Sequence, residues 1–367
     1  MRVLIVSNLD SKKPFGQFGR PFYLGRGMAE DGFEVAHVGI DCSRVRYGPA
    51  WSTGAQSLRK IGRATAVARR AFRPDVIYAH QNLPGVAALL TSGGVPVAAD
   101  FHSLPSVEWA QLAKAAPTAT ALRHRLAWLR AAAAERALAS RAEGIVSAGP
   151  GLADEIVARY HPEHPPHVVP NGFDHVMFEA PRAPVAPFDG EPAAAHALAI
   201  LPAASSASNR RALEFLGEIA RELDKRVPDL ALHVVGTDDG PQAGVLRYHG
   251  LQQVGAWLDH ADVCLLPYPS DAMHFGGSKY KLMEYLARGR RIVSTPEGTR
   301  GLEEVGDWDA VTVVPYEPAA FAEGVARAIQ PDAPSLEEKR SEVSRYRWDV
   351  LARELARGLQ EIAARAS

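Results

Sequence analysis

The stretch FGGSKYKLMEYLARGRRIVSTPEG, residues 275–298, joins a glycine-rich loop to a helical pattern and then to a strand-like apolar run. We expect a helix over residues 278–288, capped at its C-terminus by Gly289. The N–H groups at the start of a helix are unpaired and its dipole favours negative charge there, while glycines let an anion approach the backbone closely. Lys279 and Lys281 add positive charge. The stretch therefore predicts a phosphate or diphosphate site.

Glu284 follows Lys281 by three residues and is expected on the same helix face. Its carboxylate can accept hydrogen bonds from two neighbouring hydroxyls, such as those of a ribose. A plainer interpretation also fits, in which the glycines form an ordinary loop and Lys281 and Glu284 an exposed ion pair. The sequence has no G-x-x-x-x-G-K-[ST] motif, and no G-x-G-x-x-G after its first apolar run. These observations count against a P-loop and against a dinucleotide-dependent dehydrogenase.

Short apolar runs alternate with helical patterns along nearly the whole chain. They occupy residues 2–7, 34–39, 75–80, 95–100, 144–149 and 167–172, and then 196–203, 230–236, 262–268, 290–296 and 310–315. Such runs, separated by helices, are typical of parallel sheets covered on both faces. The proline-rich stretch 180–195 divides the two series and has the character of a stiff linker. We predict an α/β protein with two doubly wound domains, whose ligand sites lie at the carboxyl ends of the strands.

The composition is that of a globular protein, with 47% hydrophobic and 23% charged residues among 367 and a net charge of -1, which gives no indication of nucleic-acid binding. Residues 1–180 carry 20 Lys and Arg against 15 Asp and Glu. Much of this excess lies in 59–73 and 123–141, which are interpreted either as solvated helix faces or as a docking surface for an anionic membrane or acceptor.

Cys42 and Cys264 form neither a disulfide framework nor a zinc pattern, which points to a reducing cytoplasm. We recognise no signal peptide and no apolar stretch approaching the ~20 residues of a membrane span. The expected location is cytoplasmic, at most peripheral on the inner face of the membrane. The prolines between His161, His164 and His167 argue against a metal site there, so we expect no metal and no cofactor.

Several segments, taken in order, resemble the family-4 (group 1) glycosyltransferases, which have the GT-B fold. The opening stretch is similar to their C-terminal signature, and VPNGFD (169–174) to the end of their N-terminal domain; HGLQQVGAWLDHADVCLLPYPS (249–270) and RYRWDVLARELARGLQEI (345–362) match later segments. The resemblance implies a Rossmann-like acceptor-side domain over 1–180 and a nucleotide-sugar-binding domain over 188–347. It also implies that a C-terminal helix, 348–367, crosses back to the first domain.

Carried over position by position, the resemblance assigns most of the donor site to the second domain. The amides of Gly276, Gly277 and Ser278 would hold the donor diphosphate with Lys279 and Lys281 near it, Glu284 would bind the ribose, and Tyr248 and His249 would lie beside the base. Arg210 or Arg211 would replace a basic pair of the family. In the first domain, His102 would face the donor sugar, while Gly16 and Gly19 would shape the acceptor side or approach the phosphates.

One departure concerns the family's two glutamates, eight residues apart. Position 276 is glycine, so only Glu284 remains. The donor sugar and the stereochemical outcome are therefore open, and Asp271 or His274 could substitute from the same loop. The helix that begins with lysines also resembles an inverting glucuronosyltransferase of xanthan assembly.

The expected function is glycosyl transfer from a UDP- or GDP-sugar to the hydroxyl of a glycan, lipid-linked or small-molecule acceptor, in polysaccharide or glycoconjugate biosynthesis. Lysines and helix amides can stabilise a departing diphosphate without a metal, and we expect retention of anomeric configuration. An inverting enzyme would need a carboxylate base; Asp100, at the end of the 95–100 run, is the candidate, although it could instead cap the next turn. A nucleotide-sugar epimerase of the same fold and a binding-only module remain alternatives.

Overall fold

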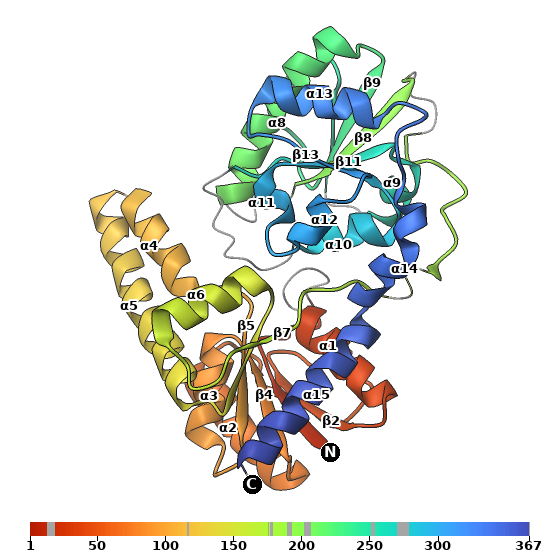
Figure 1. Ribbon diagram of the computed structural model, residues 1–367. Helices are drawn as coiled ribbons and strands as arrows, with labels where there is room; N and C mark the ends of the chain where they lie inside the picture. Colours follow the sequence, from red (N-terminus) through yellow and green to blue (C-terminus); the bar gives the residue numbers. More distant parts are fainter. Residues whose placement is uncertain are drawn as a thin grey trace. The chain divides into compact units, whose positions relative to one another are not determined.

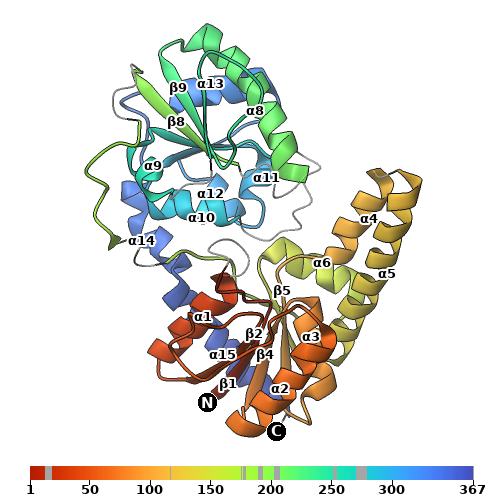
Figure 2. The same ribbon diagram turned by 180° about the vertical axis from the view of Figure 1, so that it is seen from behind.

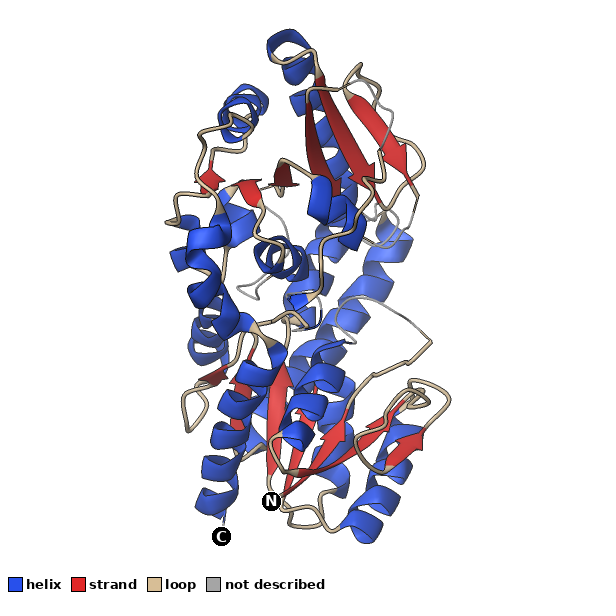
Figure 3. Cartoon of the chain, turned by 90° about the vertical axis from the view of Figure 1, so that its right-hand side faces the viewer, coloured by secondary structure: helices blue, strands red, loops and turns tan. Residues whose placement is uncertain are grey.

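The computed structural model describes residues 1–12, 19–115, 117–174, 176, 179–188, 193–201, 207–250, 254–269 and 279–366. The chain forms two compact units. The first combines Met1–Asp174 with the segment that begins at Tyr346, and the second is built from residues between 175 and 345. Each unit has one sheet with helices packed on it (Figures 1 and 3).

The sheet of the first unit is entirely parallel in its described strands. Its order is β3 (Ala50–Ser52), β2 (Glu34–Gly39), β1 (Arg2–Val6), β4 (Val76–His80), β5 (Val97–Phe101), β6 (Gly144–Ser147) and β7 (His167–Val168). The chain winds outward from β1 in one direction and then, from β4, in the other. The carboxyl ends of β1 and β4 therefore flank the topological switch point, where ligands bind in open α/β sheets.

Alternating side chains of the central strands face different helices. Leu4 and Val6 of β1 pack with α2 (Leu58–Phe72) and α3 (Asn82–Thr91). Ile5 points to the opposite face, where it meets Gly25 of α1 (Gly19–Glu30). On this face α15 (Trp348–Ala366) lies beside α1, as Figures 1 and 2 both show. Three more helices cover the region of β5 and β6: α4 (Pro105–Ala115), α5 (Thr118–Arg141) and α6 (Pro150–Tyr160).

The second sheet is also parallel, and its switch point lies between β8 and β11. Its order is β10 (Leu246–His249), β9 (Leu230–Val235), β8 (Ala195–Ile200), β11 (Val263–Leu266), β12 (Arg291–Ser294) and β13 (Val311–Val313). One face is covered by α8 (Ala207–Arg226) and α13 (Pro318–Ala328). Helices α9 (Gly255–His260) and α10 (Tyr280–Ala287) pack against β8 and β11. The shorter helices are α11 (Pro296–Thr299), α12 (Glu303–Gly306) and α14 (Arg340–Val343), with 3-10 turns at Leu336–Lys339 and Ser344–Tyr346.

The prediction of two doubly wound α/β domains is confirmed. The helix expected over 278–288 is observed over Tyr280–Ala287, and Gly289 after it has φ 64°, as a glycine cap requires. Strands β3 and β10 were not among the predicted runs, because their sequences AWS and LRYH are short and mixed in polarity. Among the described residues, no helix combines the length and the apolar character needed to cross a bilayer.

Candidate functional site

Three elements of the second unit meet at the switch point of its sheet. Lys281 of α10 donates from Nζ to the hydroxyl of Tyr268, just after β11, at 2.9 Å. The same Nζ donates to Oδ1 of Asn209, in the first turn of α8, at 3.1 Å. Lys281 also lies 5.3 Å from the centre of the Tyr268 ring. These contacts fix a cation at the carboxyl edge of the sheet, where a doubly wound fold binds its ligand.

Lys279, the N-cap of α10, brings a second cation to this edge. The residue is 6% exposed, and its Nζ has no hydrogen-bond partner among the described residues. It lies 6.0 Å from the centre of the Tyr268 ring. Burial lowers the pKa of Lys279 to about 7, although the nearby carboxylate of Glu297 opposes the shift. A buried, unpaired ammonium at a helix N-terminus is suited to an anionic ligand.

Glu284 lies one turn further along α10 and is half-buried. Burial raises its pKa to about 7, and the charge of Lys281 opposes this shift. The exposed Lys281–Glu284 ion pair of the plainer interpretation is not what the contacts show, because the ammonium of Lys281 is bound to Tyr268 and Asn209. Tyr268 and Asn209 were missed in the sequence, since neither belongs to a recognisable motif.

The other predicted donor residues in the described part of this unit have varied surroundings. Tyr248 donates its hydroxyl to the carbonyl of Pro241, and its ring packs against the core on the α8 side of the sheet. His249 is hydrogen-bonded to His233 at 3.1 Å on the face that Trp257 covers. Next to Asn209, Arg210 is exposed and Arg211 half-buried at the start of α8.

Several predicted residues lie outside those that the structure describes. They are Gly16 on the acceptor side, and Asp271, His274, Gly276, Gly277 and Ser278 before α10. Their assigned roles stay predictions. Among the described residues, no group of three or more His, Cys, Asp or Glu side chains is arranged to hold a metal ion.

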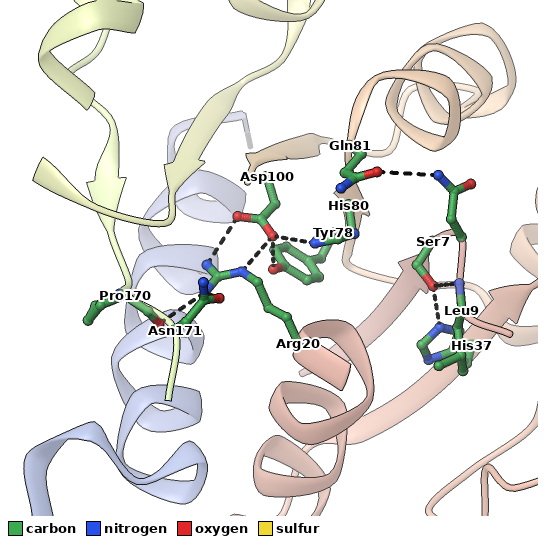
Figure 4. A network of polar contacts seen from close by, with 11 residues as sticks. Ser7, Leu9, Arg20, His37, Tyr78, His80, Gln81, Asp100, Pro170 and Asn171 are labelled. Carbon is green, nitrogen blue, oxygen red and sulfur yellow. Dashed lines mark hydrogen bonds and ion pairs between the residues drawn. The ribbon is translucent and has the colours of Figure 1, made fainter. Parts of the chain in front are cut away.

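In the first unit, Asp100 at the end of β5 is the centre of a buried polar network (Figure 4). The guanidinium of Arg20 donates hydrogen bonds to both carboxylate oxygens: Nε lies 2.9 Å from Oδ2, and one Nη lies 3.1 Å from Oδ1. Tyr78 donates to Oδ2 at 2.6 Å, and Nε2 of His80 lies 3.6 Å from it. The side chains of Arg20 and Asp100 are 0% exposed. Burial alone would raise the pKa of Asp100, but the charge of Arg20 and these hydrogen bonds hold it below its usual value.

This geometry argues against both roles considered for Asp100. A general base must reach the acceptor hydroxyl and take its proton, whereas this carboxylate is buried, accepts hydrogen bonds from Arg20 and Tyr78, and has its pKa held below the usual value. Its side chain bonds to Arg20 and Tyr78 rather than capping the following turn. Two other predicted residues lie nearby: the ring of His102 is centred 5.9 Å from that of His80, and Gly19 begins α1 directly before Arg20.

Family models match both units. Residues 4–172 match a glycosyl transferase 4-like domain, and residues 199–331 match the glycosyl transferases group 1. Comparison with curated protein sequences gave no significant match.

Solved structures share this architecture over their whole lengths. The fold is similar to sucrose-phosphate synthase from Thermosynechococcus elongatus, with a TM-score of 0.74, 16% identity and 99% of each chain covered. It is also similar to WaaG, a glycosyltransferase of lipopolysaccharide biosynthesis (TM-score 0.65, 15% identity, 100% of this chain and 98% of that one). A third similar structure is HepE from Anabaena in complex with UDP and glucose, with a TM-score of 0.65 and 15% identity; the match covers 98% of this chain and 100% of that one. The two consecutive family matches and the paired Rossmann-like sheets together show that the chain belongs to the family-4 (group 1) glycosyltransferases of GT-B fold.

Proposed function

We propose that this enzyme transfers a sugar from a nucleoside diphosphate sugar, UDP- or GDP-linked, to an acceptor hydroxyl without a metal ion and with retention of configuration. The observation that carries the proposal is the buried ammonium of Lys279 at the N-terminus of α10, which has no hydrogen-bond partner in the part of the chain that the structure describes and shares this site with the ammonium of Lys281. Two lysines and a helix dipole supply the positive charge that a departing diphosphate needs in the transition state.

The remaining groups of this edge fit the same ligand. Glu284, one turn along α10, can accept hydrogen bonds from ribose hydroxyls, as its resemblance to the family glutamate suggests. Retention is supported by the first unit, because Asp100, the candidate base for an inverting reaction, is already bound to Arg20 and Tyr78. Front-side attack assisted by the leaving phosphate needs no such base.

The donor site is tested by thermal unfolding with UDP, GDP, TDP, ADP or NAD in the presence of EDTA. A ligand at about a hundred times its Kd adds about 2.7 kcal/mol of stability. We expect one nucleoside diphosphate to stabilise the wild type and to stabilise Lys279→Met and Glu284→Gln far less. Lys225→Met, which removes an exposed lysine of α8, is the matched control and should respond like the wild type. No response of the wild type to any diphosphate would contradict the proposal.

The acceptor side includes a surface suited to an anionic membrane. Three leucines of α5, one or two turns apart, are strongly exposed: Leu122 by 61%, Leu126 by 48% and Leu129 by 53%. Trp128 is 40% exposed, and the same stretch carries Arg123, Arg125 and Arg130 with no acidic residue before Glu135. An apolar stripe flanked by arginines is the pattern of a helix that lies on anionic lipid. We propose that α5 makes a peripheral membrane contact close to a lipid-linked acceptor.

Sedimentation with vesicles tests this contact. We expect binding to phosphatidylglycerol vesicles, little binding to phosphatidylcholine, and weakening by salt. Replacing Leu122, Leu126 and Leu129 with serine should abolish it. Leu90→Ser is the control, since Leu90 of α3 is 64% exposed but lies on another helix. Equal binding of the triple variant and the wild type would contradict the role of α5.

A further inference from the structure

A buried amide lies at the switch point of the first sheet. Asn8 follows β1 by two residues, and Gln81 directly follows β4, the neighbouring strand at which the strand order reverses. Asn8 is 7% exposed, and its Nδ2 donates to Oε1 of Gln81 at 3.4 Å, a contact drawn as the dashed line from Gln81 in Figure 4. Its Oδ1 is buried without a hydrogen-bond partner among the described residues. Such an oxygen costs about 1–3 kcal/mol unless a ligand supplies a donor.

The backbone of Gln81, which contacts Asn8, is strained. Its φ of 73° and ψ of 173° lie in a region that is almost exclusive to glycine and costs on the order of 1–3 kcal/mol for other residues. Two backbone hydrogen bonds within the described part of the chain support the conformation: the Gln81 N–H donates to the Asp100 carbonyl, and the Gln81 carbonyl accepts from the Gly85 N–H, both at 2.9 Å. A glycine would remove the strain, yet the position carries a long amide side chain that contacts Asn8.

The chemistry of this edge favours an uncharged ligand. Asn8 and Gln81 are neutral amides, and the charge of Asp100 is matched by Arg20. The imidazole of His80 is also neutral at pH 7, because burial lowers its pKa to about 4 against the opposing effect of Asp100. A phosphate or carboxylate would find no compensating cation on these side chains, whereas a hydroxyl can donate to the free acceptor of Asn8.

We propose that Oδ1 of Asn8 accepts a hydrogen bond from a hydroxyl of the acceptor sugar, and that Gln81 is a positioning residue that holds the Asn8 amide. This inference names the substrate class of the first unit and rests on the proposed transfer reaction. It adds to the glycosyltransferase site two residues that no motif of the sequence marks.

Saturation-transfer NMR with a panel of neutral methyl hexosides, recorded in the presence of UDP, tests the assignment. The wild type should show transfer to at least one glycoside. In Asn8→Ala the affinity for that glycoside should fall about tenfold, as expected for a lost hydrogen bond in a buried site. Gln81→Gly should also bind the glycoside more weakly while its Tm is unchanged or higher, because glycine adopts the observed φ without strain.

Arg73→Gly is the matched control for the backbone effect. Arg73 also has a positive φ, 52°, at the end of α2, and it contacts neither amide. Its glycine variant should keep the glycoside signal. A wild type that binds UDP but none of the glycosides overturns the hydroxyl site alone, as does an unchanged affinity in Asn8→Ala. A wild type that binds no UDP contradicts the donor proposal instead.

Discussion

Both units bury ionisable side chains near the carboxyl edge of their sheets, but the charges there are paired in the first unit and, among the described residues, not in the second. In the first unit, the side chains of Asp100 and Arg20 are both fully buried and form a bidentate ion pair. In the second, Lys279 is buried and its ammonium has no hydrogen-bond partner within the described ranges, and burial moves the pKa values of Lys279 and Glu284 to about 7. Removing one member of a buried ion pair is costly for the fold, whereas perturbed pKa values of buried groups are common at ligand sites, which agrees with the proposed donor site in the second unit.

The largest expected effect comes from breaking the paired side of this comparison. Asp100→Ala leaves the guanidinium of Arg20 buried without its partner and should destabilise the protein by about 3–5 kcal/mol, measured as a lower midpoint in urea. Replacing both members, in Arg20→Met/Asp100→Leu, should cost clearly less, because an apolar pair leaves no buried charge. Equal losses for the single and double variants would show that the ion pair is not what the fold depends on.

An opposite change is expected on the unpaired side. Lys279→Met removes a buried, unsatisfied ammonium and should stabilise the free protein by about 1–3 kcal/mol. The same variant should lose the stabilisation that a nucleoside diphosphate gives the wild type. A Lys279→Met protein that is much less stable than the wild type would mean that the ammonium has a structural partner.

The same lysine also makes the free energy of unfolding depend on pH. Lys279 has a folded pKa of about 7, below its ordinary 10.5. The unfolded chain therefore binds more protons between these values, and this residue makes stability rise with pH from about 7 to 10.5. The rise should be reduced in Lys279→Met when unfolding is followed across this range.

Glu284 contributes in the opposite direction. Its folded pKa of about 7 exceeds its ordinary 4.5, so its contribution is complete below about pH 4.5 and is lost as pH rises through 7. Glu284→Gln should flatten this part of the profile. If the pH dependence of stability is the same in Glu284→Gln and in the wild type, the carboxylate of Glu284 is solvated in the folded protein, unlike the buried ammonium of Lys279.

The sequence predicted the architecture well because strands and helices leave periodic patterns. The apolar runs of β1, β2 and β9 were placed to within a residue, and the helix α10 to within two. The start of α10 could be singled out for a different reason, because its glycines, lysines and Glu284 occur within one short stretch of sequence.

What the sequence did not show depends on contacts between distant residues. Arg20 and Asp100 are 80 positions apart, so nothing local indicated that the candidate base was already paired. Lys281 and Asn209, whose side chains are hydrogen-bonded, are likewise 72 positions apart. The strained backbone of Gln81 leaves no trace in its residue type, because glutamine is ordinary at the start of a helix.

The packing of α15 against α1 has a consequence for synthesis. A side chain at Gly27 would overlap Ala352, with their Cβ atoms 2.6 Å apart, and Trp348 stacks on Tyr23. The first unit therefore takes its last helix from residues translated after the whole of the second. On the ribosome, the second sheet can be complete while the face of the first unit that carries Gly27 and Tyr23 is still uncovered, and that face is covered only after α15 has been synthesised.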